Sequence, residues 1–253
     1  MTHNQPTFSI VTVSFNCRDQ IEKTMKSVMQ QSYAGKEYIV IDGGSTDGTA
    51  EIIKSHSENL AYWCSEPDGG IYQGMNKGIS RAKGDWIIFM NAGDTFADNQ
   101  VLEHTATYAQ KGKYDVIYGD ILKIIDGETV LKTASEPCNK QRMYFCHQAA
   151  FTKTALMREM LFDTRFPMSA DLHFFKQCYL SGHKFLHIPV TVAVYDSHGV
   201  SNTQRIKGLR DNVRVVKELD KGSERRKFLL KLYYVIYWNS LRNFVKSAIR
   251  SKQ

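Results

Sequence analysis

The sequence predicts an α/β fold with a mainly parallel central sheet flanked by helices. Short runs rich in β-branched and aromatic residues alternate with segments whose apolar residues recur at helical spacing. This alternation is typical of parallel sheets, because each helix returns the chain to the start of the next strand. The 253 residues are enough for one large domain, whose core needs no disulfide or metal to be stable.

The elements follow one another with clear boundaries. Polar or glycine-rich turns separate them, as after residues 38–41, where Asp42-Gly-Gly-Ser-Thr-Asp-Gly48 closes a short strand. Predicted strands are residues 8–15, 38–41, 62–63, 85–90, 114–118 and 185–194, the last broken at Pro189. Predicted helices are residues 19–31, 49–56, 71–83, 99–110 and 169–181, and residues 121–132 are predicted as a hairpin that turns at Asp126-Gly127.

Composition restricts where the protein works. The cysteine count is odd and no C-x-x-C occurs, which favours reduced thiols in the cytoplasm over a disulfide framework or a zinc site. The first residues lack the basic and apolar regions of a secretion signal, and no run of 18 apolar residues predicts a spanning helix. We therefore expect a cytoplasmic protein.

Positive charge is concentrated at the C-terminus. Residues 205–253 hold 14 Lys/Arg and 4 Asp/Glu, whereas the rest of the chain is slightly acidic. The basic, aromatic segment from Glu224 to Trp238 predicts an amphipathic helical tail that contacts an anionic membrane surface. The alternative is a helix packed on the core. We accordingly divide the chain into an α/β domain, residues 1–204, and a basic tail, residues 205–253.

Polar and small residues gather where the predicted strands end. Ligands of open α/β sheets bind beyond the carboxyl ends of the strands. Those ends carry Ser14 to Asn16, Asp42 to Asp47, Asn91 to Asp94, and Gly119-Asp120. The pattern therefore predicts a ligand site at this edge of the sheet.

Each candidate side chain also has a purely structural interpretation. Asp42 can accept hydrogen bonds from a ligand's base or sugar, or cap the next helix. Asp94 can hold Mg²⁺ or Mn²⁺ beside a diphosphate, or end a turn. Asp171 can act as a general base, or stabilise the first turn of its helix. His198 can bind a metal or be an ordinary polar residue, and His147-Gln148 can line an acceptor pocket or bridge backbone groups.

The order and spacing of four motifs resemble family 2 glycosyltransferases with a GT-A fold, above all bacterial members that build polysaccharides. The resemblance covers residues 8 to about 200. The motifs are Ser9-Ile-Val-Thr-Val-Ser-Phe-Asn16, Val40-Ile-Asp-Gly-Gly-Ser-Thr-Asp-Gly48, Glu66-Pro-Asp-Gly-Gly-Ile-Tyr-Gln-Gly-Met-Asn-Lys-Gly78 and Phe89-Met-Asn-Ala-Gly-Asp94. The third motif is the most specific.

The resemblance implies a role for each residue. Asp171 would be the catalytic base, and Asp94 and His198 would bind Mn²⁺ or Mg²⁺. From their own polar character beside an apolar run, His147 and Gln148 are expected to line the acceptor pocket. Residues 1–95 would form the donor half and residues 96–204 the acceptor half. The nucleotide-sugar would be bound by Ser14, Phe15, Asn16, Asp42, Gly44, Asp68, Lys77, Asn91, Ala92 and Gly93.

Three positions depart from the family pattern. Gly93 stands where many members have the first of two paired acids, and Asn91 is an amide where many have an acid. Ala170 precedes the base, where Glu is common. Metal affinity or donor preference is expected to differ as a result.

The reaction implied is a single in-line displacement that inverts the anomeric centre without a covalent sugar–enzyme intermediate. Asp171 takes the proton of the acceptor hydroxyl, and the metal neutralises the leaving nucleoside diphosphate. UDP is the favoured nucleotide. A saccharide or a lipid-linked sugar is the expected acceptor.

Competing functions fit the sequence less well. No G-x-G-x-x-G follows the first strand and no P-loop occurs, which disfavours an NAD-dependent oxidoreductase or a P-loop enzyme. A sugar nucleotidyltransferase would carry a glycine-rich, Arg-containing loop after that strand. A non-catalytic basic module for membranes or nucleic acid would leave the strand-end acids unexplained, and we expect no nucleic-acid partner.

Overall fold

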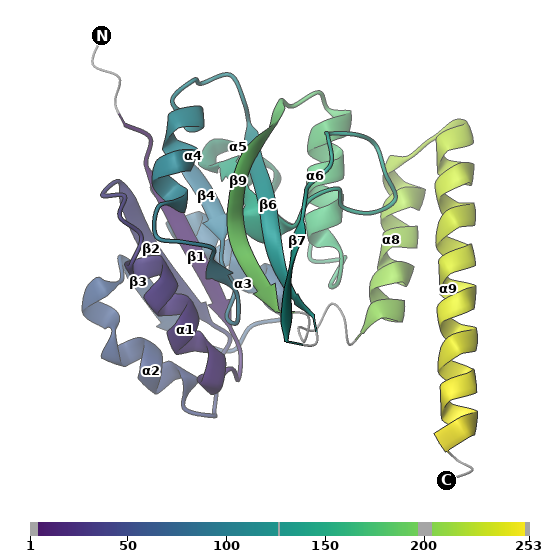
Figure 1. The fold of residues 1–253 in the computed structure, drawn as a ribbon, viewed down its shortest axis with the longest axis horizontal. Helices are drawn as coiled ribbons and strands as arrows, with labels where there is room; N and C mark the ends of the chain where they lie inside the picture. Colours follow the sequence, from purple (N-terminus) through teal and green to yellow (C-terminus); the bar gives the residue numbers. More distant parts are fainter. Residues whose placement is uncertain (1–4, 126, 197–203, 251–253) are drawn as a thin grey trace.

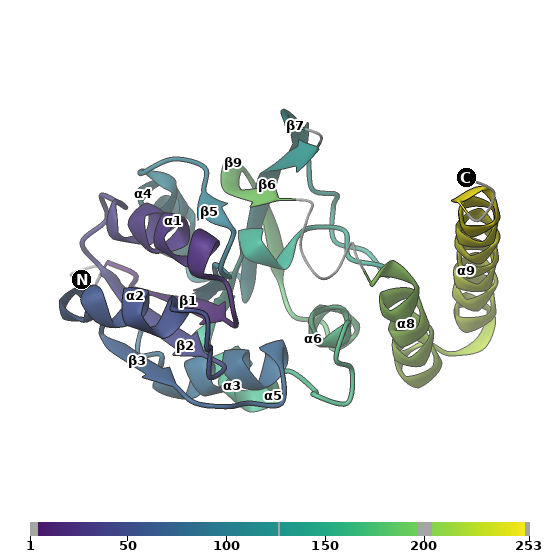
Figure 2. The same ribbon diagram turned by 90° about the horizontal axis from the view of Figure 1, so that it is seen from below.

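The computed structural model describes residues 5–125, 127–196 and 204–250. Within them one mixed sheet runs in the order β3-β2-β1-β4-β8-β6-β9-β5, with β7 paired to β6 (Figure 1). Helices cover both faces, as seen end-on in Figure 2. The predicted α/β class is confirmed.

The first half of the sheet is parallel, as the sequence predicts. It consists of β1 (Phe8–Ser14), β2 (Lys36–Asp42), β3 (Tyr62–Ser65) and β4 (Trp86–Phe89). The residues of β1 are buried throughout, and alternate side chains enter two separate apolar clusters. The helices that return the chain are α1 (Arg18–Met29), α2 (Thr49–Ser55) and α3 (Ile71–Arg81), with the short η1 (Ser57–Asn59) after α2.

The helices divide between the two faces. On one face, α1, α2 and α4 (Val101–Ala109) bury apolar residues against β1, β2 and β4. On the other face lie α3, α5 (Thr154–Met160) and α6 (Ala170–Leu180). The result is three layers, with the core on each side of the sheet (Figure 2).

The second half of the sheet is mixed, with antiparallel pairs beside the parallel pair of β6 and β9. β8 (Ala150–Lys153) runs antiparallel between β4 and β6 (Val116–Ile125). β9 (Phe185–Asp196) is parallel to β6, whereas β5 (Thr95–Phe96) is antiparallel to β9. β7 (Glu128–Lys132) forms the predicted hairpin with β6. Strands as short as β5 and β8 carry too few residues for a periodic pattern to be recognised.

The predicted break at Pro189 is an irregularity within one strand. Tyr118 pairs with His187 and Asp120 pairs with Thr191, so β9 carries extra residues between these pairs. Pro189 lies in that stretch, where a missing backbone N–H costs no ladder hydrogen bond. A Cβ on Gly119 would lie 2.2 Å from the carbonyl oxygen of Val190, so only glycine lets the two strands approach here.

The C-terminal residues form two antiparallel helices, α8 (Arg205–Leu219) and α9 (Gly222–Arg250). α8 packs against α6 and buries Val215 in the core, whereas α9 lies on the outer side of α8 (Figure 1). Among the described side chains of α9, Phe228 and Leu232 are buried against α8. In the part of the chain described, no helix is both long and apolar enough to cross a bilayer.

Candidate active site

The segments after β1, β2 and β4 lie side by side at one edge of the sheet. The backbone N–H of Gly43 donates to Ser14 O at 2.9 Å, and that of Ala92 donates to Val13 O at 3.2 Å. Parallel pairing of these strands brings their carboxyl ends together, because Ser14 is in register with Asp42. The edge predicted from the sequence is therefore a single surface.

Asp42 organises the loop that follows β2. Its buried carboxylate accepts hydrogen bonds from Ser14 Oγ (2.8 Å), Ser65 Oγ (2.6 Å), and both the N–H (2.8 Å) and the Oγ (2.6 Å) of Ser45. Burial alone would raise the pKa of Asp42, but these hydrogen bonds outweigh it and hold the pKa below its ordinary value. Asp42 thus fixes three segments at the edge.

Phe15 and Asn16 follow β1 at the same edge. The Phe15 ring is 65% exposed, which is unusual for a residue that directly follows a buried strand. Asn16 has a left-handed backbone with φ of 46°. Its Oδ1 accepts a hydrogen bond from Thr46 N at 2.9 Å, so Asn16 ties this turn to the loop after β2. The exposed ring is available to a flat partner such as a base.

Asp68 reaches the edge from the turn before α3. Its Oδ1 accepts the N–H of Gly70 at 2.8 Å, and its carboxylate lies 3.3 Å from where a Cβ of Gly43 would stand. Gly44 has φ of 81°, and a Cβ there would lie 2.9 Å from Pro67 N. Lys77 forms an ion pair with Glu66 at 2.9 Å, and that partner raises the pKa of Lys77.

The loop after β4 places Asp94. Gly93 has φ of 102° and donates its N–H to Thr24 Oγ1, which in turn donates to Asp94 O at 2.7 Å. The Asp94 side chain is buried, and Gln148 Nε2 donates to its Oδ2 at 3.2 Å. Thr24 of α1 therefore fixes the backbone of Asp94. Gln148 of η2 (His147–Ala149) contacts its carboxylate.

Asn91 ends the same strand and faces η2. Its Nδ2 donates to His147 Nε2 at 3.3 Å. Its buried Oδ1 has no hydrogen-bond partner among the described residues. A buried amide oxygen without a partner is costly, so a ligand group that reaches it would be stabilised there.

Asp171 stands in the first turn of α6 and is held by three donors. His147 Nδ1 lies 3.2 Å from Oδ2, while Tyr72 OH (2.9 Å) and Leu172 N (2.8 Å) donate to Oδ1. Burial would raise the pKa of Asp171, but His147, Leu172 and Tyr72 together hold it below its ordinary value. Burial, together with the charge of Asp171, keeps the pKa of Tyr72 well above the usual range, so the phenol stays protonated and donates.

Cys146 directly precedes η2. Burial raises the pKa of its thiol to about 12, and the charges of Asp94 and Asp171 contribute to the same shift. His147 and Gln148, predicted for the acceptor pocket, thus contact the candidate base and the candidate metal ligand. Tyr72 was missed by sequence reasoning, although it stands inside the most specific motif, next to Ile71 at the start of α3.

His198 lies outside the described residues, so its predicted metal contact remains a prediction. The neighbouring strand β9 does end at this edge, because Val194 pairs with Thr95, the residue after Asp94.

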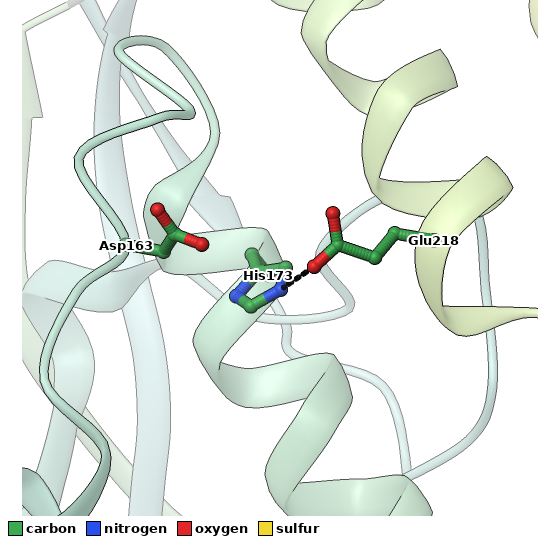
Figure 3. A group of neighbouring side chains, drawn as sticks. All are labelled: Asp163, His173 and Glu218. Atoms are coloured by element: carbon green, nitrogen blue, oxygen red, sulfur yellow. Dashed lines mark hydrogen bonds and ion pairs between the residues drawn. The ribbon is translucent and has the colours of Figure 1, made fainter.

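A second group of potential metal ligands lies elsewhere, between α6 and α8. Figure 3 shows Asp163, His173 and Glu218, whose ligand atoms all lie within 4.8 Å of one another. The Arg165 guanidinium pairs with Asp163 at 2.5 Å and with Glu218 at 3.1 Å. A guanidinium already neutralises both acids, so we interpret this group as an ion-pair network that joins α8 to the core.

Comparison with known proteins agrees with this geometry. Residues 9–171 match the family model described as glycosyl transferase family 2. The chain belongs to that family. An uncharacterized glycosyltransferase of Mycobacterium tuberculosis is 36% identical over 178 residues, which are 67% of each chain. A glycosyltransferase of PGL/p-HBAD biosynthesis from Mycobacterium bovis is 28% identical over 211 residues, or 78% of this chain and 80% of the relative.

Solved structures confirm that this family 2 member has a GT-A fold. TarS of Staphylococcus aureus in complex with UDP has a TM-score of 0.68 at 18% identity, covering 90% of this chain and 70% of that one. The mannosyltransferase PcManGT of Pyrobaculum calidifontis, in complex with GDP-Man and Mn²⁺, has a TM-score of 0.67 at 18% identity, covering 92% of this chain and 70% of that one. Identities this low bear on the fold alone.

Proposed function

We propose that this glycosyltransferase is an inverting, metal-dependent enzyme that transfers one sugar from a nucleoside-diphosphate sugar to an acceptor hydroxyl. The observation that carries the proposal is the η2 turn, through which adjacent residues contact Asp171 and Asp94. A base and a metal ligand must both reach the reacting bonds. Through His147 and Gln148, this one turn contacts the carboxylates of both Asp171 and Asp94.

The residues at the edge fit a divalent cation. Asp94 offers a buried carboxylate, and Asn91 Oδ1 is a buried oxygen without a partner in the described chain. Mg²⁺ and Mn²⁺ prefer such oxygen ligands. Asp94 would hold the ion with His198, and the bound ion would stabilise the charge of the departing diphosphate.

The chain's own groups account for the other requirements of the reaction. Asp171 accepts the proton of the acceptor hydroxyl as the new bond from that oxygen to the anomeric carbon forms. The bond from that carbon to the diphosphate breaks on the opposite side, and the nucleotide leaves with the electron pair. Phe15 supplies an exposed ring for the base, and Asp42, Asp68 and the glycine turns shape the donor edge.

UDP is the proposed nucleotide, since structures of the neighbour TarS contain UDP and UDP-GlcNAc. The relatives named for PGL/p-HBAD and teichuronic acid biosynthesis favour a saccharide or lipid-linked acceptor in bacterial surface polysaccharide or glycolipid synthesis.

A panel of nucleotide sugars tests this proposal. Wild type with Mn²⁺ or Mg²⁺ is expected to release nucleoside diphosphate from one donor, slowly with water and faster with acceptor. Asp94→Asn should abolish metal-dependent release, whereas the matched control Asp98→Asn, on the exposed surface of the same segment, should not. Formation of a nucleoside triphosphate and a sugar 1-phosphate when pyrophosphate is added to the same donors would instead indicate a nucleotidyltransferase, and the absence of both release and UDP binding would refute the proposal.

We also place the reaction at the cytoplasmic face of the membrane. α9 carries an exposed apolar stripe on the face opposite Phe228 and Leu232. Exposed Lys227, Lys231 and Arg242 flank it. Aromatic residues with basic neighbours suit the interface of an anionic bilayer, whereas two copies of so basic a tail would repel each other. The stripe consists of Leu230, Tyr233, Tyr234, Tyr237, Trp238 and Leu241.

Vesicle sedimentation of the full chain tests the membrane contact. Binding to vesicles with anionic lipid should exceed binding to neutral vesicles and weaken with salt. The double variant Tyr237→Ser, Trp238→Ser should lose binding, whereas Leu131→Ser, at an exposed apolar residue of β7, should keep it. Unchanged binding by the double variant would contradict the proposal. Loss of self-association in that variant would instead assign the stripe to a second copy.

A further inference from the structure

His147 lies between two polar partners from opposite sides of the site. Its Nδ1 is 3.2 Å from Asp171 Oδ2, and its Nε2 is 3.3 Å from Asn91 Nδ2. The amide nitrogen of Asn91 can only donate, so Nε2 of His147 accepts. The single proton of a neutral imidazole then stands on Nδ1 and is donated to Asp171.

The two oxygens of Asp171 have separate partners. Tyr72 OH and Leu172 N hold Oδ1, so among the residues that the structure describes His147 alone reaches Oδ2. Without the imidazole, the carboxylate would keep only the partners of one oxygen and could rotate about them. The base would then present a range of orientations to the acceptor.

We propose that His147 is a positioning residue, a neutral imidazole that fixes the orientation of the Asp171 carboxylate relative to Asn91 at the donor edge. This inference rests on the proposed role of Asp171 as the base. The side chain itself does not need to touch the substrate or to change its protonation. Its contribution is geometric, because small displacements of a reacting group lower the rate of proton transfer strongly.

The rigid turn makes this assignment specific to His147. Gln148, the next residue, is directed to Asp94, and Ala149, the last residue of η2, is fully buried in the core. η2 is therefore fixed from below while its polar side chains point to the base and to the loop after β4. Because η2 is held in place in this way, His147 can contact Asp171 and Asn91, which belong to different elements, at the same time.

Two substitutions separate the two contacts of the imidazole. His147→Asn keeps an N–H near the position of Nδ1 and loses the reach to Asn91. His147→Gln keeps a polar group near Nε2 and loses the donor to Asp171. The probe is hydrolysis, without acceptor, of whichever UDP-sugar wild type turns over, with water in the place of the acceptor hydroxyl.

His147→Gln is expected to lower kcat at least about tenfold while the donor KM stays within about twofold. His147→Asn should retain a larger part of kcat. A merely structural role would lower both variants alike. Equal kcat in the two variants, or a loss carried by KM, would overturn the proposal.

Nitrogen-15 NMR of the histidine side chains gives a second readout that needs no turnover. The expected signal for His147, assigned by its disappearance in His147→Asn, is a neutral ring with the proton on Nδ1. A ring protonated on Nε2 would overturn the proposal. If wild type binds no UDP and hydrolyses no donor, the proposed function fails, while the NMR result still decides the geometry of His147.

Discussion

Lys176 Nζ lies 2.9 Å from the Asp220 carboxylate, and both side chains are almost fully buried. Lys176 comes from α6, and Asp220 lies in the turn between α8 and α9. Asn139 Nδ2 donates to the same carboxylate at 2.9 Å. This pair therefore attaches the turn between the two C-terminal helices to α6.

Removing one partner of this pair should destabilise the protein. Lys176→Met leaves a buried carboxylate without its cation, and the free energy of unfolding should fall by about 3–5 kcal/mol. Denaturant unfolding measures the loss. Adding Asp220→Leu should recover part of it. Lys26→Met, which breaks an exposed pair with Glu22, should change the free energy of unfolding far less. Equal losses from the two Lys substitutions would contradict this account.

Asp171→Asn should abolish base catalysis without weakening nucleotide binding. The amide occupies the same volume but accepts no proton, so kcat should fall by roughly 10²–10⁴. Binding of UDP, followed by calorimetry, should stay close to wild type, because Asp171 contacts η2 and α3 rather than the loops after β1 and β2. A comparable loss of UDP affinity would show that Asp171 serves the donor instead.

The acid limb of the pH–rate profile should report Asp171. Its pKa is lowered, so the carboxylate is ionised above that value and activity falls only as the pH drops through it. Tyr72→Phe removes one hydrogen bond to the ionised form, so the pKa should rise and the limb should move to higher pH. A limb that stays in place, or moves to lower pH, would refute this assignment.

Gly93→Asp tests whether the family's paired acid can be restored. Gly93 has φ of 102°, which L side chains rarely adopt, and a Cβ would lie 3.0 Å from Gln20 Oε1. We expect a loss of about 1–3 kcal/mol in unfolding free energy and no gain in metal affinity. Asn91→Asp, on ordinary backbone, should be tolerated better. A stable Gly93→Asp protein with tighter Mn²⁺ binding would contradict the prediction.

The sequence predicted the parallel half of the fold because local patterns determine it. The buried residues of β1 and β2 and the polar turns after them are visible within a few residues of one another. The position of Asp171 is different. Its return to the edge depends on β8, which is four residues long, and on η2, and neither carries a periodic signal.

The strand-end positions of the candidate site residues could be predicted, whereas the hydrogen bonds between them could not. Asp42 and Asp94 stand at strand ends, where ligands of α/β sheets bind. However, Asp42 was predicted to bind the nucleotide-sugar. Nothing in the sequence indicated that its carboxylate accepts four hydrogen bonds from its own chain. Tyr72 and Asp171 are far apart in sequence, so their hydrogen bond follows only from how α3 and α6 pack on one face of the sheet.

The start of α3 lies between the proposed donor site and the candidate base Asp171. Asp68 accepts the N–H of Gly70 just before the helix begins, and Tyr72, in its first turn, donates to the base. On the proposed roles of these residues, a nucleotide bound against the start of this helix would immobilise the Tyr72 phenol that holds the candidate base Asp171. An enzyme built in this way should follow compulsory-order kinetics, in which the acceptor engages productively only after the donor has arrived.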